Sequence, residues 1–206
     1  MQQTDSDIQA KDEQIGGENI IMQQTDKDVC AWYVMKVLWR QETKTAQRFA
    51  EAGLETYLPM KQVLREYQKR KERKMVPVIN GLLFVHSSIH TLEEVKKLLS
   101  NKYGQTIYFY TNIVHGKNKI TSIPEKQMDD FKMACSLAGD SVKYFLPEEV
   151  QLKKGARVRI HGGAFDGCEG VLLKVKGIRQ KSFVISIEGF LSAAIADISP
   201  EFIEQI

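Results

Sequence analysis

Histidine and cysteine are the residue types of this chain best suited to metal binding or nucleophilic catalysis. They stand at His86, His90, His115, His161, Cys30, Cys135 and Cys168. These positions lack the spacing of a metal site or of a CxxC pair, and no glycine-rich phosphate loop precedes a predicted helix. Asp166 and Glu169 are interpreted as turn formers rather than as a catalytic carboxylate pair. We therefore expect a protein without enzymatic activity, cofactor or metal.

Phosphate binding is the chemistry that the charged residues favour. The segment 61–74, KQVLREYQKRKERK, holds seven basic residues against two glutamates, which predicts an exposed, charged excursion. Two interpretations stay open: basic side chains that only face solvent, or a contact with nucleic-acid phosphates that does not read base sequence. The basic residues at the end of this segment are Lys69, Arg70, Lys71, Arg73 and Lys74.

The charge and composition of the chain change along its length. Its 206 residues suffice for two small domains, and a change of character near residue 140 favours that division. Residues 1–28 carry seven acids and two lysines, a local charge of −5, so the remainder carries +8 and the whole chain +3. We expect residues 1–28 to be a disordered acidic leader. We interpret its repeated heptad, MQQTDSD at Met1 and MQQTDKD at Met22, as an artefact or the mark of an upstream in-frame start rather than as a working repeat.

Membrane and secreted classes are not favoured. The longest apolar runs are far shorter than the roughly 20 residues of a membrane span, and no secretory segment is seen. The three cysteines do not form the pattern of a disulfide framework. We expect a cytoplasmic protein.

The N-terminal part, residues 29–138, alternates apolar strands with amphipathic helices. Gly53 is placed to end the first helix, and Thr91 with Glu94 predicts a capping box at the start of the second. The order β-α-β-β-α-β-α predicts a ferredoxin-like, split βαβ domain of the α+β class. The predicted strands are 31–38, 55–60, 82–85 and 106–111, and the predicted helices are 41–54, 91–100 and 124–137.

Residues 139–150 are a predicted linker, and residues 151–206 hold short strands only, which predicts a small SH3-like, five-stranded β-barrel. We expect Gly162 and Gly163 to allow positive φ in a turn, and Gly170 to let the chain bend into the next strand. Phe165 either covers one end of the barrel or offers an exposed contact. The glycines of this loop are Gly162, Gly163, Gly167 and Gly170, and the predicted strands are 157–160, 170–175, 183–188 and 193–198.

Three stretches together resemble the NusG family of transcription elongation factors. They are WYV at the start of the first domain, PVINGLLFV on its central strand, and KKGARVRIHGGAFDGCEGVLLKV, which resembles a KOW motif. The resemblance covers about residues 30–206 and implies an NGN domain at 29–138 and a KOW domain at 151–206. The stretches YLPM, IHTL and GAFDG resemble the specialised RfaH-like and UpxY-like antiterminators of capsular loci.

The resemblance implies that the NGN domain docks on the clamp of the largest subunit of RNA polymerase. Trp32 and the LLFV run also fit a buried core. For Tyr33 and Ile79 the pattern does not decide between a core position and a contact with polymerase. This chain has INGL where the family commonly has FPGY, which implies altered partner selectivity. By position, the polymerase-binding residues are Trp32, Tyr33, Ile79, Asn80 and Leu82, joined by His90 and Thr91. For Thr91 the helix cap is the favoured role.

By the same resemblance, the basic segment lies beside upstream DNA, and Lys36 and Arg40 contact the non-template strand. The implied function is suppression of pausing and readthrough of early terminators, operon-specific at capsular polysaccharide-type loci, by a monomer whose KOW domain contacts a further protein or RNA. Two alternatives stay open: a general NusG elongation factor, and a ribosomal or RNA-processing KOW protein.

Overall fold

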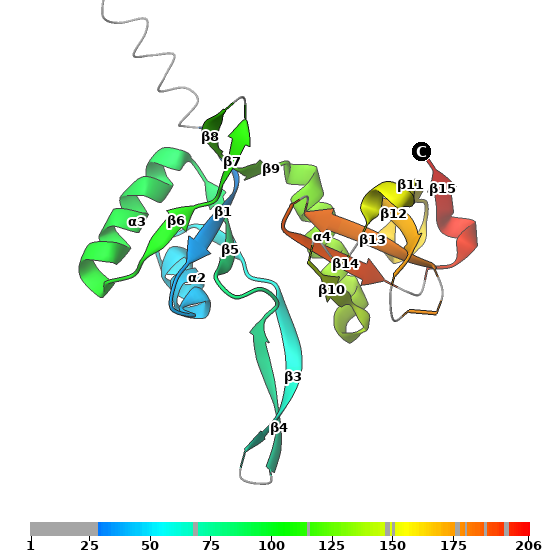
Figure 1. Cartoon of the computed structure of the whole chain (residues 1–206), viewed down its shortest axis with the longest axis horizontal. Helices are drawn as coiled ribbons and strands as arrows, with labels where there is room; N and C mark the ends of the chain where they lie inside the picture. Colours follow the sequence, from blue (N-terminus) through cyan, green and yellow to red (C-terminus); the bar gives the residue numbers. More distant parts are fainter. Residues whose placement is uncertain are drawn as a thin grey trace, which may run out of the picture.

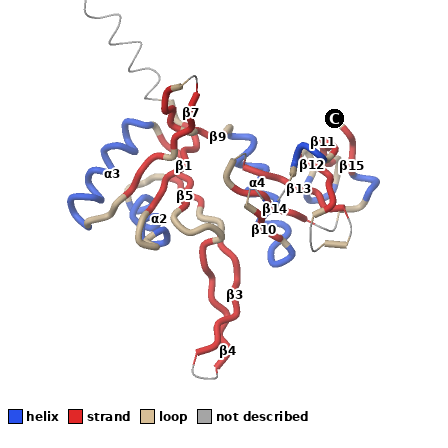
Figure 2. The backbone as a smooth tube through the Cα atoms, in the orientation of Figure 1, coloured by secondary structure: helices blue, strands red, loops and turns tan. Residues whose placement is uncertain are grey.

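The computed structural model describes residues 29–67, 70–114, 116–146, 149, 151–175, 178–179, 181–187, 189–195 and 198–206. This part of the chain is a mixed α+β structure in four layers (Figure 1). Helices α2 (Glu42–Glu51) and α3 (Ile89–Tyr103) form the first layer, and a sheet forms the second. Helix α4 (Glu125–Ala138) is the third layer, and a second sheet is the fourth, as the tube in Figure 2 also shows.

The first sheet is built around β1 (Ala31–Val37), which pairs with three other strands in antiparallel fashion. The strand order is β2-β5-β1-β6, and β9 also pairs with β1. These strands confirm the four predicted for the N-terminal part, although the second and the fourth are shorter than expected. Their bounds are β2 Glu55–Tyr57, β5 Leu82–Ser87, β6 Ile107–Phe109 and β9 Ser122–Ile123.

Successive residues of β1 are buried against different helices. Tyr33 and Met35 pack in one core cluster with Phe49 of α2 and Leu92 of α3. Trp32 lies on the opposite face, in a second cluster that includes residues of α4. Since side chains alternate along a strand, burial of both faces of β1 requires apolar residues at nearly every position.

The helix ends show one confirmed and one wrong prediction. Gly53, with φ +81°, follows Ala52, the C-cap residue of α2, as expected of a glycine that ends a helix. The predicted cap by Thr91 is wrong, because α3 begins earlier and Ser88 is its cap: the Ser88 hydroxyl accepts from the Thr91 N–H at 3.2 Å. Ile89, half-buried against the core of this layer, extends the helix by its first turn.

Two hairpins interrupt the first sheet. Strands β3 (Met60–Tyr67) and β4 (Arg70–Pro77) pair along their whole length and project from the body of the molecule (Figure 1). Most of the described side chains in the excursion predicted at 61–74 are exposed. Its strands were not predicted, because strongly charged residues obscure the period of 2. The shorter hairpin, β7 (Thr111–Val114) and β8 (Lys117–Ile120), was not predicted either.

Within the described ranges, the second sheet has six antiparallel strands rather than the five predicted, in the order β10-β14-β13-β12-β11-β15. The additional strand is β10, which comes from the predicted linker and pairs with β14. The other strands lie within the predicted C-terminal part. Their bounds are β10 Lys143–Phe145, β11 Ala156–Ile160, β12 Glu169–Lys174, β13 Lys181–Ile187, β14 Leu191–Ile195 and β15 Ile203–Gln205.

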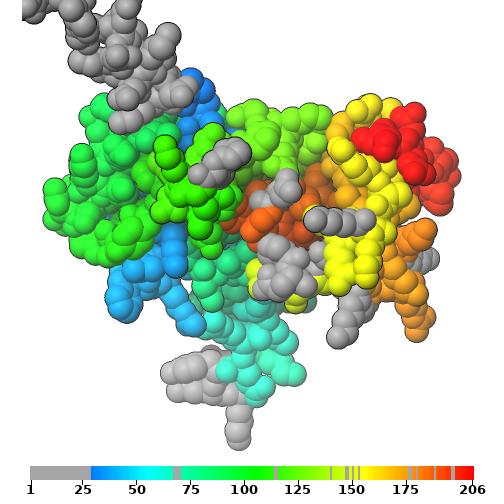
Figure 3. All heavy atoms as spheres, turned by 45° about the horizontal axis from the view of Figure 1, so that its top comes forward, coloured from blue at the N-terminus to red at the C-terminus, as the bar shows by residue number. Residues whose placement is uncertain are grey.

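Helix α4 joins the two sheets. Its Met128 and Phe131 are fully buried in one cluster with Trp32 of the first sheet and Phe183 of the second. Figure 3 shows the light-green surface that includes α4 adjoining the yellow and orange surface of the C-terminal strands. Polar contacts also cross this interface: Lys126 Nζ donates to the Gly167 carbonyl at 3.1 Å.

Gly170 has a different role from the one predicted. It lies within β12, where a Cβ would meet Phe183 Cε2 at 2.5 Å and the Val184 carbonyl oxygen at 2.6 Å. Close packing against β13, rather than a bend at the strand entry, therefore requires glycine here. The expected positive φ is found at Gly162, at +81°, and at Gly163, at +69°.

We expect Gly170→Ala to lower the free energy of unfolding by about 1–3 kcal/mol, because the methyl group must displace Phe183 or the β13 backbone. Urea denaturation followed by circular dichroism measures this change, with the exposed Ala164→Ser as the control. A stability equal to that of the wild type would show that the strands separate freely at this point.

The thiols of Cys135 and Cys168 are buried, whereas that of Cys30 is exposed. Burial raises the pKa of both buried thiols to about 11. The Cys135 side chain is also hydrogen-bonded to Tyr57 and Tyr144, and burial raises the pKa of both tyrosines. Since the thiolate is the reactive form, these two cysteines are structural.

We expect one of the three cysteines to react rapidly with Ellman's reagent at pH 8 in the folded protein, and all three after unfolding in urea. Cys30→Ser is expected to remove the fast phase. A fast phase that persists in this variant would contradict the burial of Cys135 and Cys168.

Candidate nucleic-acid and polymerase interface

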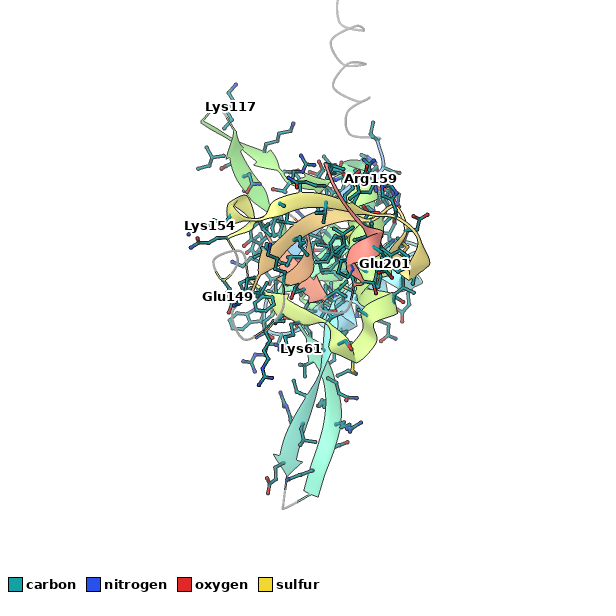
Figure 4. All side chains as sticks on the ribbon, turned by 90° about the vertical axis from the view of Figure 1, so that its right-hand side faces the viewer. Lys61, Lys117, Glu149, Lys154, Arg159 and Glu201 are labelled. Atoms are coloured by element: carbon teal, nitrogen blue, oxygen red, sulfur yellow. The ribbon has the colours of Figure 1, made fainter. Side chains whose placement is uncertain are left out.

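The β3–β4 hairpin concentrates positive charge on a thin, exposed element. Its register pairs Lys61 with Val76, Val63 with Lys74 and Arg65 with Glu72. Because directly paired residues share a face, the side chains of Lys61, Arg65 and Lys74 lie on one face of the ribbon, which we call the basic face. Figure 4 labels Lys61 near the point where the hairpin leaves the body.

The other face of the hairpin is less charged and more apolar. Lys71 and Arg73 share it with Glu66, and the exposed side chains of Leu64 and Met75 lie beside them. The single basic run of the sequence is thus divided between two faces. Among the residues predicted to bind nucleic acid, Lys71, Arg73 and Lys74 are exposed, Arg70 belongs to β4, and Lys69 lies outside the described residues.

Sequence reasoning missed Lys61 and Arg65, which belong to β3 and lie across the ribbon from β4. Their signal was the high charge of the whole segment, but only the strand register places them with Lys74. Lys36 and Arg40, predicted for the non-template strand, are exposed at the carboxyl end of β1. That end adjoins the chain leaving the hairpin, because the Val37 N–H donates to the Gly81 carbonyl at 2.8 Å.

The residues predicted to bind polymerase do not form one surface in this structure. Trp32 is fully buried, and its Nε1 donates to Glu125 Oε1 of α4 at 3.1 Å. Tyr33 is also buried but lies on the opposite face of the sheet, and Leu82 belongs to the Trp32 cluster. Alternation along β1 is the physical reason, because neighbouring residues of a strand face opposite ways.

Ile79 and Asn80 are the members of that set at the surface, half-buried and exposed respectively. They lie between β4 and β5, at the base of the hairpin. The following residue, Gly81, is held at both ends: its N–H donates to the Glu42 carboxylate, and its carbonyl accepts from Val37. Ile79 and Asn80 are therefore presented on a fixed backbone.

His90 and Thr91 lie in the first turn of α3. His90 is exposed, with Nε2 3.8 Å from Glu94 Oε1, and Thr91 Oγ1 is 3.0 Å from the hydroxyl of the capping Ser88. Thr91 is half-buried, so its hydroxyl supports the helix start, while His90 remains accessible.

The loop before β12 packs against α4 instead of projecting. Phe165 is half-buried beside the cluster that α4 shares with both sheets. Asp166 accepts from the Gly162 N–H at 2.6 Å, which confirms it as a turn former. Glu169 instead belongs to β12, and its pKa is lowered by the hydrogen bond from Arg159, whose Nη2 is 2.6 Å away.

Among the described residues, no group of three histidine, cysteine or acidic side chains is arranged to hold a metal ion. No helix in the described ranges is long and apolar enough to cross a membrane.

A comparison with curated proteins gave no match. A family model described as transcription termination factor NusG matches residues 30–132, from the start of β1 into α4. NusG-family proteins are non-enzymatic factors of transcription elongation and antitermination that act with RNA polymerase. Because the matched segment is half of the chain, this protein belongs to the NusG family.

Proposed function

We propose that this protein binds the clamp of elongating RNA polymerase, suppresses pausing and promotes readthrough of early terminators. The observation that carries the proposal is that the family-matched segment brings a fixed surface loop and a basic hairpin to the same end of the first sheet, where β5 begins. Ile79 and Asn80 form the loop, and the hairpin ends at Pro77, two residues before Ile79. A protein contact and a phosphate contact are thus adjacent.

Ile79 and Asn80 suit the polymerase contact because they offer an apolar side chain beside an amide on a backbone anchored through Gly81. A preorganised loop loses little conformational entropy on binding. Trp32 and Leu82 support this loop from the core rather than touching the partner, and His90 adds a separate polar contact at the start of α3.

The hairpin suits upstream duplex DNA. The side chains of Lys61, Arg65 and Lys74 lie on the basic face of the ribbon. Among the described side chains of that face, Glu72 is the acidic one. Lysine and arginine at these spacings neutralise phosphates without reading bases. The contact would hold the protein on the DNA behind the polymerase.

An operon-specific role, at capsular polysaccharide-type loci, rests on the YLPM, IHTL and GAFDG stretches. A general elongation factor is the alternative.

The second sheet supports a KOW assignment, since β11 to β14 pair in sequence and β15 returns to β11. It would offer a further protein or RNA its surface away from α4, in a protein that acts as a cytoplasmic monomer.

Ile79→Ala combined with Asn80→Ala is expected to weaken binding to reconstituted elongation complexes about tenfold, because truncation of both side chains leaves the centre of the interface unfilled. Pause duration in single-round transcription should then return toward that of polymerase alone. Ile113→Ala, at a position 77% exposed in the β7–β8 hairpin, serves as the matched control. Wild-type binding by the double variant, with an unchanged melting temperature, would refute the proposed docking site.

Lys61→Gln, Arg65→Gln and Lys74→Gln together are expected to weaken binding to duplex DNA about tenfold at roughly 0.1 M salt. The slope of log K against log salt should fall by about 0.9 for each phosphate that the variant no longer neutralises. Fluorescence anisotropy on two duplexes of unrelated sequence measures both quantities. Lys44→Gln, Lys97→Gln and Lys102→Gln make the same charge change on α2 and α3; equal weakening in the two triple variants would mean that net charge alone attracts DNA.

A further inference from the structure

The β3–β4 hairpin carries two strongly exposed apolar side chains. Leu64 is 62% exposed and Met75 is 52% exposed. The core clusters of the described residues include Val78 and Ile79 at the base of the hairpin, but neither Leu64 nor Met75. A single exposed apolar residue is ordinary on a protein surface, whereas neighbouring ones that form a patch mark an interaction site.

These two side chains are neighbours on one face of the ribbon. Leu64 is paired directly with Arg73, and Met75 comes two residues after Arg73 on the same strand. Met60 and Pro77, paired at the base of the hairpin, continue this face toward the body and are half-buried. We call the strip of Met60, Leu64, Met75 and Pro77 the apolar face; it lies opposite the basic face.

The outer part of the hairpin lacks the support of a larger sheet. Strands β3 and β4 form a two-stranded sheet of their own, and Figure 4 shows most of its length extending away from the body. The base is anchored, because the Val78 N–H donates to the Pro59 carbonyl at 2.8 Å. A two-stranded ribbon by itself is marginally stable in water, and packing on one of its faces stabilises it. A partner that covers one face would therefore order the hairpin.

The two faces of the ribbon suit different partners. The basic face suits phosphates, as proposed above. The apolar face does not, because leucine and methionine gain most when they pack against other apolar side chains. Methionine and arginine are also enriched where proteins meet, and Arg73 lies beside Leu64 on this face. The apolar face is therefore suited to binding a protein.

The position of the apolar face indicates which protein covers it. Pro77 ends β4, and the proposed polymerase contact at Ile79 and Asn80 follows within three residues. Leu64 lies four residues beyond the start of β3, which is about 13 Å along the strand. The apolar face thus continues the proposed polymerase contact outward from the first sheet, over a distance that one partner can span.

We propose that RNA polymerase covers the apolar face, so that the hairpin is held between polymerase on that face and duplex DNA on the basic face. This proposal rests on the proposed function and extends its polymerase contact from Ile79 and Asn80 to Leu64 and Met75. The polymerase surface that fits is apolar, with an acidic side chain opposite Arg73. The hairpin then couples the contact with polymerase to the position of the DNA.

The test compares the full-length wild type with a variant that combines Leu64→Thr and Met75→Thr. Threonine removes apolar surface but is β-branched, so it favours the strands. We expect this variant to bind RNA polymerase free of nucleic acid about tenfold more weakly than the wild type does. Its affinity for duplex DNA, measured by fluorescence anisotropy, should stay within about twofold, because the basic face is unchanged.

Two further variants separate the two faces. Leu98→Gln combined with Ile113→Thr removes exposed apolar side chains from α3 and from the β7–β8 hairpin, and should bind polymerase as the wild type does. The triple variant Lys61→Gln, Arg65→Gln and Lys74→Gln should lose affinity for DNA but keep its affinity for polymerase free of nucleic acid. Circular dichroism spectra that match the wild type show that each variant is folded.

Photo-cross-linking in elongation complexes identifies the partner directly. With p-benzoylphenylalanine in place of Leu64, the adduct should contain a polymerase subunit. A cross-link to DNA instead would overturn the proposal, and so would a cross-link to a second copy of this chain.

Unchanged polymerase binding by the combined Leu64 and Met75 variant would also overturn the proposal. If polymerase binding depends on Ile79 and Asn80 but not on Leu64 and Met75, the proposed function stands and its extension to the apolar face is refuted. If the wild type binds neither polymerase nor elongation complexes, the proposed function itself fails.

Discussion

The packing of the chain depends on β1, a strand buried on both faces. One face carries Tyr33 and Met35 against α2 and α3, and the other carries Trp32 and Val34 against α4. A strand in this position cannot slip by one residue without exchanging the two sets, so its register is strongly constrained. That register sets the places of β5, β6 and β9, and through them of both hairpins.

Helix α4 extends this constraint to the C-terminal half. It buries Phe131 in a cluster that reaches from Trp32 to Phe183, and removing a ring of this kind from a core usually costs about 3–5 kcal/mol. One hydrogen bond and one aromatic contact then orient the second sheet: Gln127 donates to the Ser186 carbonyl at 3.1 Å, and Tyr110 packs edge-on against Phe190 with centroids 5.0 Å apart. The burial of Trp32 is therefore a consequence of how the two halves pack.

Local sequence patterns predicted the elements whose structure depends mainly on their own residues. The apolar runs of β1 and β5 and the glycine after α2 are of this kind. Elements fixed by distant partners were not predictable. The β3–β4 ribbon has too many charges to show alternation, β10 forms only because β14 is beside it, and Ser88 displaces Thr91 as a cap because Ile89 packs in the core. The candidate site divides in the same way, since its basic residues were found from composition, but their shared face depends on the register of β3 and β4.

Strand β10 also sets how far the second sheet can move. While β10 stays paired with β14, the tether between α4 and the sheet is residues 139–142, which span at most about 14 Å when extended. A second sheet that separated from α4 would then remain close to it. If β10 separates from β14, the tether becomes residues 139–155, and its extended length is about 60 Å. The three residue pairs between β10 and β14 thus decide whether the second sheet is connected to α4 by a short tether or by a long one.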